Sequence, residues 1–332
     1  MNQESSSSPI RTMVRYVFGI LAFISVAGAA GDTMAQSYPN RPIRFIVPFP
    51  AGSAPDHIAR IVGQHMQQTL GQTIVIDNRP GAQGLIGAAE AVKSTPDGYT
   101  VFAGSNTTMA ANPSLFKKLP YDPVKDFTPV ARLITSALML VVRADFPARN
   151  LSEFVAYARA RPGQLSAGYA SAGMQVGIAE LKSLAGITVL EVPYKGVPQA
   201  VTDILAGQIQ FTFADSAVAL TQMKGGKVLA LAITSRNRSR LAPDIPALAE
   251  EIPGFDVSVW NGLFARAGTP REIVNKLHDA ARKAVTSPDV IARLNILGQE
   301  PAPLTPEEFR KFMLSEIAKW AKQIKQAGIQ PE

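Results

Sequence analysis

The chain has 332 residues, of which 46% are hydrophobic and 18% are charged, and it carries a net charge of +7 and no cysteine. This composition excludes global disorder and suits one large domain or two medium ones. Without cysteine the chain forms no disulfide, no thiolate metal site and no lipid anchor through a cysteine. The basic residues are scattered, and no known nucleic-acid motif accompanies them, so we expect no nucleic-acid partner. Their one cluster, at 236–240, is interpreted as a solvated loop or, alternatively, as a contact with a partner.

Residues 1–35 predict a secretory signal peptide. Arg11 and Arg15 precede an uncharged run over 17–30, and the segment closes with Ala35. This order is typical of a signal peptide that is cleaved between Ala35 and Gln36. The alternative is a membrane anchor, for which a run of 14 residues is short, because the hydrocarbon core is ~30 Å thick. We therefore expect an exported protein.

From Arg44 onward, short apolar runs alternate with helical patterns. This alternation predicts an α/β fold with mainly parallel sheets. Because no long linker interrupts the pattern, two domains would have to exchange strands directly. Thr305, Pro306 and Glu308 form a capping-box pattern at the start of the last helix. Strands are predicted at 44–47, 73–76, 99–103, 165–169, 211–214 and 228–233, and helices at 58–70, 151–160, 197–206, 270–286, 288–297 and 306–327.

The loop 48–56 joins a predicted strand to a predicted helix. Such a loop leaves backbone N–H groups at a helix N-terminus, where those donors and the helix dipole bind anions. Ser53 and Asp56 have capping-box spacing, so the alternative is a satisfied helix cap with nothing bound.

A second glycine-containing loop, 79–87, also lies between a predicted strand and a helix. Its spacing is G-x-x-G-x-x-G and differs from the G-x-G-x-x-G of dinucleotide sites, and no acidic residue ends the following strand. A close backbone approach to an anion smaller than a nucleotide fits better, and we expect no cofactor.

Catalytic patterns are poor. His57, His65 and His278 have no metal-ligand spacing, and no G-x-S-x-G motif occurs. Asp215 ends an apolar strand, where it either acts as a base, holds a ligand amine or caps the next helix. We therefore expect a binding protein and no enzyme. The enzyme alternative, a hydrolase or dehydrogenase, needs a nucleophile–base pair or a nucleotide site, and neither is present in the sequence.

Several motifs together resemble the substrate-binding proteins of tripartite tricarboxylate transporters, the Bug-type family. The resemblance covers nearly all of the chain after residue 35. The motifs are YPNRPIR at 38–44, VPFPAG at 47–52, DNRPGA at 77–82, TPDGYT at 95–100, LPYDP at 119–123, DFTPV at 126–130, VPYKG at 192–196, LAGQ at 205–208, WNGLFA at 260–265 and GTP at 268–270.

Membership implies a type II periplasmic binding fold, with two lobes that close around a ligand. The lobes are expected at 36–104 with 230–332, and at 105–229. The resemblance also implies a periplasmic monomer that holds a small carboxylate and delivers it to membrane permease subunits; an alternative is an accessory protein that reports the ligand to a membrane receptor. One lobe is expected to contribute Phe49, Ala51, Gly52, Ser53, Gln83, Gly84, Ser105, Asn106, Thr107 and Thr108, and the other Ser171, Gly173, Met174, Gln175, Tyr194, Lys195 and Asp215.

The sequence departs from the family pattern at two places. Ser53 stands where a second glycine is usual and adds a hydroxyl. The segment 169–180 is about three residues shorter than the usual loop and lacks its histidine, offering Met174 and Val176 instead. With Phe49 opposite, these residues favour an acid with an aromatic or medium-chain apolar body; alternatively, they only pack the next helix.

Overall fold

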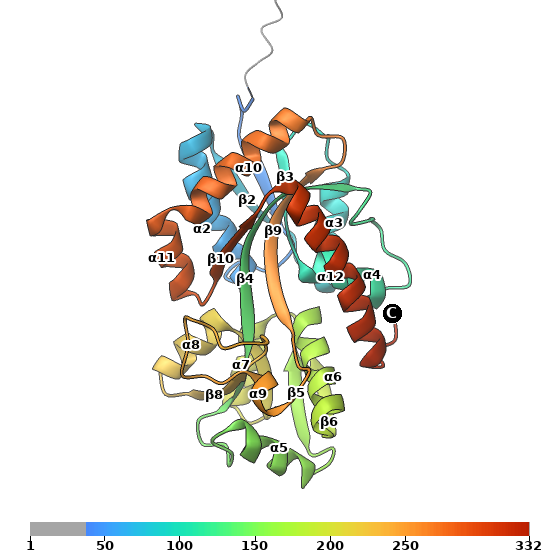
Figure 1. Cartoon of the computed structure of the whole chain (residues 1–332), viewed down its shortest axis with the longest axis vertical. Helices are drawn as coiled ribbons and strands as arrows, with labels where there is room; N and C mark the ends of the chain where they lie inside the picture. Colours follow the sequence, from blue (N-terminus) through green and yellow to red (C-terminus); the bar gives the residue numbers. More distant parts are fainter. Residues whose placement is uncertain (1–37, 332) are drawn as a thin grey trace, which may run out of the picture. The chain divides into compact units, whose positions relative to one another are not determined.

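The structure, a computed structural model, describes residues 38–331 (Figure 1). The predicted signal peptide and its cleavage site lie outside these residues. Residues 41–332 belong to one compact unit, which is described here.

One half of the sheet is built from the two ends of this unit and is named the terminal half-sheet. Its parallel strands β1, β2 and β3 are joined by antiparallel β9, and β10 pairs with β4 (Figure 1). Its strands are β1 (Ile43–Val47), β2 (Ile74–Asn78), β3 (Thr100–Ser105), β9 (Ser258–Arg266) and β10 (Glu300–Leu304). Its helical segments are α2 (Ala54–Leu70), η1 (Ala82–Gly84), α3 (Leu85–Val92), η2 (Thr107–Ala111), α4 (Asn112–Leu115), α10 (Arg271–Thr286), α11 (Pro288–Ile296) and α12 (Pro306–Gln326).

The other half, the central half-sheet, comes from the middle of the chain. Parallel β5 pairs with β6 and β7, and antiparallel β4 pairs with β7 and β8. Its strands are β5 (Leu165–Tyr169), β6 (Val189–Pro193), β7 (Phe211–Asp215) and β8 (Val228–Ile233), and its helices are α5 (Leu151–Arg159), α6 (Ala172–Ala185), α7 (Val197–Leu205), α8 (Ser216–Lys224) and α9 (Leu248–Glu251).

Strand β4 (Phe127–Arg143) belongs to both halves. Its first part, 127–137, pairs with β9, and its last part, 138–143, pairs with β7 and β8. The chain thus passes between the halves inside a strand near residue 137 and returns where β9 begins (Figure 1). The predicted α/β fold is confirmed, but the sheet is more mixed than expected, because β4, β8, β9 and β10 run antiparallel to their neighbours.

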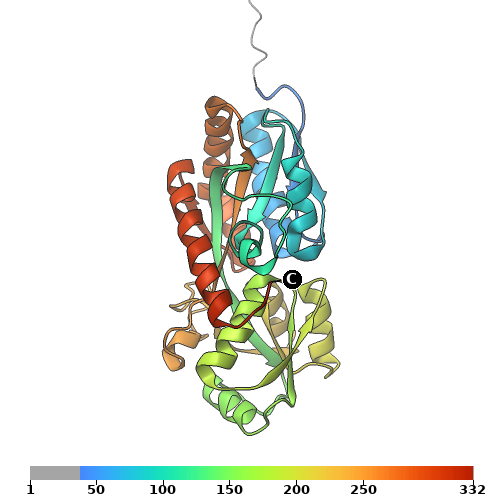
Figure 2. The same ribbon diagram turned by 90° about the vertical axis from the view of Figure 1, so that its right-hand side faces the viewer.

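The helix α12 packs along the terminal half and ends beside α6 of the central half (Figure 2). Its predicted cap is confirmed: the Thr305 hydroxyl accepts from Glu308 N at 3.2 Å, and the Glu308 carboxylate accepts from Thr305 N at 3.0 Å. Under α12, Phe309 lies so close to β9 that a Cβ at Gly262 would sit 2.4 Å from the Phe309 ring, so glycine is required there. Within residues 38–331, none of the helices has the length and apolar character needed to cross a bilayer.

Buried tryptophans join α12 to β9. The Trp260 and Trp320 side chains are each 1% exposed, and both indole N–H groups donate to Glu316 Oε2, at 2.9 and 3.1 Å. A single buried carboxylate therefore satisfies two donors from different elements.

Candidate functional site

A cavity lies where the carboxyl ends of parallel strands from both half-sheets meet. The segments that follow β1, β3, β5 and β6 line it, as does Asp215 at the end of β7. The helices α2, α6, α7 and α8 begin in these same segments, so four helix N-termini meet at one cavity. The first N–H groups of a helix have no partner within it and attract anions. The lining residues are Phe49–Pro55, Ser105–Thr107, Leu138, Ala170, Ser171, Met174, Lys195–Pro198, Asp215, Val218, Val259, Asn261 and Gln299.

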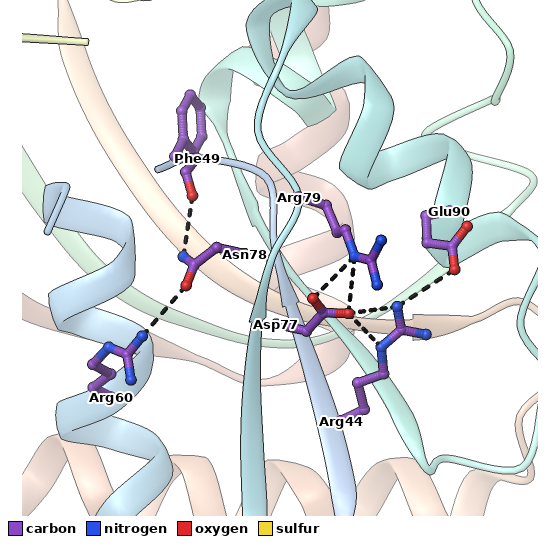
Figure 3. Close-up of polar contacts among 7 residues, drawn as sticks. All are labelled: Arg44, Phe49, Arg60, Asp77, Asn78, Arg79 and Glu90. Atoms are coloured by element: carbon purple, nitrogen blue, oxygen red, sulfur yellow. Dashed lines mark hydrogen bonds and ion pairs between the residues drawn. The ribbon is translucent and has the colours of Figure 1, made fainter. Parts of the chain in front are cut away.

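The loop after β1 is held by one buried carboxylate. Asp56, 2% exposed, accepts from Gly52 N at 2.9 Å, from Asn78 Nδ2 at 3.0 Å and from Arg60 Nε at 3.0 Å. Asn78 Nδ2 also donates to the Phe49 carbonyl at 3.1 Å (Figure 3). The capping box that the Ser53–Asp56 spacing indicates does not form, because Asp56 bonds to Gly52 N and the Ser53 hydroxyl caps nothing.

We expect Asp56→Asn to lower the free energy of unfolding at pH 7 by about 2 kcal/mol, because the variant loses charge-assisted bonds to Gly52 N and Arg60. Burial raises the pKa of Asp56, but hydrogen bonds from Arg60, Gly52 N and Asn78 outweigh it, so the net shift is downward. This stabilisation is present above the unfolded pKa of about 3.9 and is lost as pH falls through the lower folded pKa. Urea unfolding at pH 7 and pH 3 should show that the difference in free energy of unfolding between wild type and Asp56→Asn is smaller at pH 3. Asp145→Asn, at an exposed position, is the control; an equal loss in both variants contradicts the assignment.

Next to Asn78, a second ion-pair network fixes β1 against β2. The Asp77 carboxylate accepts from Arg44 Nε at 2.7 Å and from Arg79 Nε at 2.9 Å, and Arg44 also reaches Glu90 of α3 at 3.4 Å (Figure 3). The network ties the start of the loop 79–87 to the sheet.

The end of β3 supplies polar groups that have no partner of their own. Thr108 Oγ1 accepts from Ser105 N at 3.0 Å, in a π-helical turn that holds Ser105, Asn106 and Thr107 against the cavity. Ser105 Oγ and Asn106 Nδ2 are buried without a hydrogen-bond partner among the described residues, as is Ser53 Oγ from the first loop. Buried polar atoms are almost always satisfied, so these three groups point to a ligand.

The central half contributes the N-terminus of α6. Ser171 and Met174 line the cavity, and Met174 Sδ accepts from Ala170 N at 3.3 Å. Val176 is fully buried and lies outside the lining, so of the two apolar residues in the shortened segment only Met174 is in the cavity.

Two charged side chains line the cavity, Lys195 before α7 and Asp215 at the end of β7. Asp215 precedes α8, but its side chain makes no cap bond, so the interpretation as a helix cap is wrong. Burial raises the pKa of Asp215 to about 6.

A neighbouring cavity shares Phe49, Pro50, Ala170 and Lys195 with the first and contains three more predicted site residues: Gln83, Gly84 and Tyr194. Ala82, Gln83 and Gly84 all have positive φ, so the loop 81–84 is tightly coiled. Tyr194 is held by its hydroxyl, which donates to Asp203 at 2.7 Å.

The structure therefore brings most predicted site residues together. Eleven of them line the first cavity: Phe49, Ala51, Gly52, Ser53, Ser105, Asn106, Thr107, Ser171, Met174, Lys195 and Asp215. Three others line neither cavity. Thr108 is buried and bonded to Ser105, a Cβ at Gly173 would lie 3.1 Å from Val259, and Gln175 lies one turn into α6. The lining residues that the sequence did not predict include Leu138, Val197, Pro198, Val218, Val259, Asn261 and Gln299, most of which lie inside strands or on a helix face.

None of the three histidines belongs to the lining of either cavity. His278 is buried, with Nδ1 3.0 Å from the Val130 carbonyl, and His57 and His65 lie on α2. Over residues 38–331, His, Asp and Glu form no group of three that could hold a metal ion.

The chain matches the family model described as the tripartite tricarboxylate transporter family receptor over residues 58–329. The periplasmic binding protein BugD superposes with a TM-score of 0.83 at 31% identity, covering 89% of this chain and 100% of that chain. The structure of R. palustris Rpa4515 with adipate superposes with a TM-score of 0.86 at 30% sequence identity, covering 89% of this chain and 100% of that chain. MatC from Rhodopseudomonas palustris with bound malate superposes with a TM-score of 0.79 at 35% sequence identity, covering 86% of this chain and 100% of that chain. The chain therefore belongs to the tripartite tricarboxylate transporter receptor family, a family of periplasmic solute-binding receptors of the Bug type.

Proposed function

We propose that this protein is a monomeric periplasmic receptor that captures a small carboxylate with an apolar body and delivers it to a membrane permease. The observation that carries the proposal is the cavity where four helix N-termini meet the unpartnered Ser53, Ser105 and Asn106 side chains. Helix N-termini and hydroxyl or amide donors suit a carboxylate.

The rest of the lining favours an apolar ligand body. Leu138, Met174, Val197, Val218 and Val259 contribute aliphatic or thioether surface, and Phe49 adds an aromatic ring. Each further carboxylate would need its own donors, because burying an unpaired charge costs several kcal/mol. The relatives that bind adipate and malate hold dicarboxylates. An aromatic or medium-chain acid with one carboxylate fits the present lining better than a tricarboxylate.

Capture requires that the cavity open and close. We propose that the two half-sheets act as lobes, joined through β4 and β9. One lobe would then comprise residues 41–136 and 258–331, and the other residues 138–257. The boundaries between the lobes would lie where β4 and β9 cross between the half-sheets, and not at 104/105 and 229/230 as the sequence suggested. Ligand binding would shift the lobes toward the closed form to the extent of its differential affinity.

A thermal-shift screen over mono-, di- and tricarboxylates, aromatic acids and amino acids tests the ligand class. We expect an aromatic or medium-chain monocarboxylate at saturation to raise the melting temperature most, because it binds the folded state alone. X-ray scattering with that ligand should show a smaller radius of gyration. A largest shift from citrate, with none from apolar acids, contradicts the proposed ligand class.

Export gives a further expected result. Mass spectrometry of protein from the periplasmic fraction should find a chain that begins at Gln36, because the signal peptide is removed after Ala35. A chain that keeps Met1 and stays with the membrane would refute the cleavage.

A further inference from the structure

We propose that Asp215 selects the ligand by requiring a hydrogen-bond donor, a hydroxyl or an ammonium group, on the ligand's apolar body. This inference rests on the proposed function and specifies its ligand further. Asp215 lines the cavity at the end of β7, and its carboxylate makes no hydrogen bond or ion pair with any residue that the structure describes. A desolvated carboxylate without a donor is costly, and a ligand that supplies one removes that cost.

The surroundings of Asp215 leave this role to the ligand. Strand β4 places uncharged Leu138 opposite Asp215 in the register, α8 continues with Ser216, and α6 brings Met174 to the cavity. The Ser216 hydroxyl is already used, since it donates to the Ala137 carbonyl at 2.8 Å. Lys195 is the other charged side chain in the lining, and it forms no ion pair with Asp215.

The two charges of the lining match a particular ligand. The carboxylate of the ligand is attracted by Lys195 and the helix N-termini, whereas a second carboxylate next to Asp215 is repelled unless one of the two acids takes up a proton. Because burial places the pKa of Asp215 near 6, a dicarboxylate should bind more tightly at pH 5 than at pH 8. A hydroxy acid needs no such proton.

Four acids of equal chain length test this: hexanoate, ω-hydroxyhexanoate, ω-aminohexanoate and adipate, measured by calorimetry at pH 5 and pH 8. For wild type we expect the hydroxy or amino acid to bind at least tenfold more tightly than hexanoate, and adipate to lose at least tenfold between pH 5 and pH 8. In Asp215→Asn, the preference for the ammonium group should disappear, and the pH dependence for adipate should shrink to the part that comes from the ligand's own second carboxyl group. The control is Asp145→Asn, whose carboxylate is exposed and lies outside both cavities.

The outcomes separate the two levels of inference. If all four acids bind wild type and Asp215→Asn with the same ranking and the same pH dependence, the role of Asp215 is overturned while the carboxylate receptor stands. If none of the four binds, the proposed ligand class fails, and the role of Asp215 falls with it.

A different pair of side chains ties α6 to α12. Glu180 Oε1 accepts from Gln323 Nε2 at 2.9 Å, and Gln323 Nε2 also donates to the Asp256 carbonyl at 3.0 Å. Glu180 Oε2 and Gln323 Oε1 are both buried acceptors without a partner among the described residues. We infer that Glu180 is protonated in this conformation and that its Oε2–H donates to Gln323 Oε1, which satisfies both orphaned atoms in a two-bond acid–amide pair.

This proton would act as a clasp between the halves, because α12 packs on the terminal half while α6 carries cavity residues of the central half (Figure 2). Burial raises the pKa of Glu180 to about 7 and outweighs the Gln323 bond, the Lys319 charge and a bond from the Asp256 backbone, which lower the pKa; the Asp256 charge raises it. Lys319 also lies 4.0 Å from Glu316, and on α6 itself Lys182 is paired with Glu191 of β6. The clasp is complete below the unfolded pKa of about 4.3 and is lost as pH rises through 7.

Glu180→Gln replaces the proton with an amide N–H that persists at every pH. We expect the melting temperature of wild type to fall more between pH 5 and pH 8 than that of Glu180→Gln, with the exposed control Glu272→Gln behaving as wild type. Carbon-13 NMR of labelled glutamate gives an independent reading, in which one carboxyl absent from Glu180→Gln titrates near pH 7. Titration of that carboxyl below pH 5, or equal pH profiles for wild type and Glu180→Gln, overturns the clasp.

Discussion

Glu316→Leu is expected to lower the free energy of unfolding by about 3 kcal/mol. The substitution removes the acceptor that serves Trp260 and Trp320, and it leaves two buried indole N–H groups without a partner. Each such donor costs about 1–3 kcal/mol. Leucine has a similar size, so a cavity contributes little to the loss.

Urea unfolding followed by tryptophan fluorescence measures this effect. The matched control is Glu307→Leu on the same helix, where the carboxylate is exposed and pairs with Arg271 on the surface. Exposed pairs contribute little, so the control should stay within about 1 kcal/mol of wild type. A loss for Glu316→Leu no larger than that of the control would show that the two indoles do not depend on this carboxylate.

Gly52→Val is expected to weaken ligand binding at least tenfold, or by about 1.4 kcal/mol. Gly52 has φ of 80°, a conformation that a β-branched residue avoids. No atom lies within 4 Å of a Cβ built there, and Gly52 belongs to the lining of the cavity, so the added side chain has room to occupy space beside the ligand. Backbone strain and obstruction both act on the loop that presents the α2 N-terminus.

The control for Gly52→Val lies at the other end of the same helix. Gly71, the C-cap of α2, has φ of 68° and an equally open Cβ position, but it lies away from the cavity. Gly52→Val and Gly71→Val should each lower the free energy of unfolding by about 2 kcal/mol, because a valine is strained in the left-handed backbone conformation. Only Gly52→Val should weaken ligand binding. Equal affinities for the two variants, measured by calorimetry with the best ligand of the screen, would remove this loop from the site.

Of the ten strands within residues 38–331, the sequence predicted six and missed β4, β6, β9 and β10. β5 and β8 lie at the predicted bounds; β8 is an isolated apolar run, and the turn residues Pro162 and Gly163 precede β5. β4 was missed because 127–143 is a long run with few turn signals, in which no period separates strand from helix. β10 was missed because two of its five residues are proline, which disfavours a strand. Proline is tolerated there because β10 is an edge strand that pairs with β4 alone.

Cavity residues at the ends of strands were predictable from the sequence, whereas cavity residues inside strands were not. Ser105, Ser171 and Asp215 stand where strands end, and the carboxyl ends of parallel strands gather at one edge. Leu138 and Val259 sit inside strands that cross between the halves, so their place in the cavity depends on a pairing that no local pattern reveals. The capping box predicted from the Ser53–Asp56 spacing does not form, because the Asp56 carboxylate accepts hydrogen bonds from Arg60 and Asn78.

The path of β4 and β9 also bears on how the chain reaches its fold. All other strands and helices of the central half-sheet lie between the two crossings, within residues 138–257, so this half can condense from one contiguous segment. The terminal half must join β3 to β9 across that whole segment, and closing a long loop is slow unless the intervening chain is already compact. Early folding of the central half would bring the two ends of the terminal half together, so we expect assembly to proceed from the middle of the sequence outward.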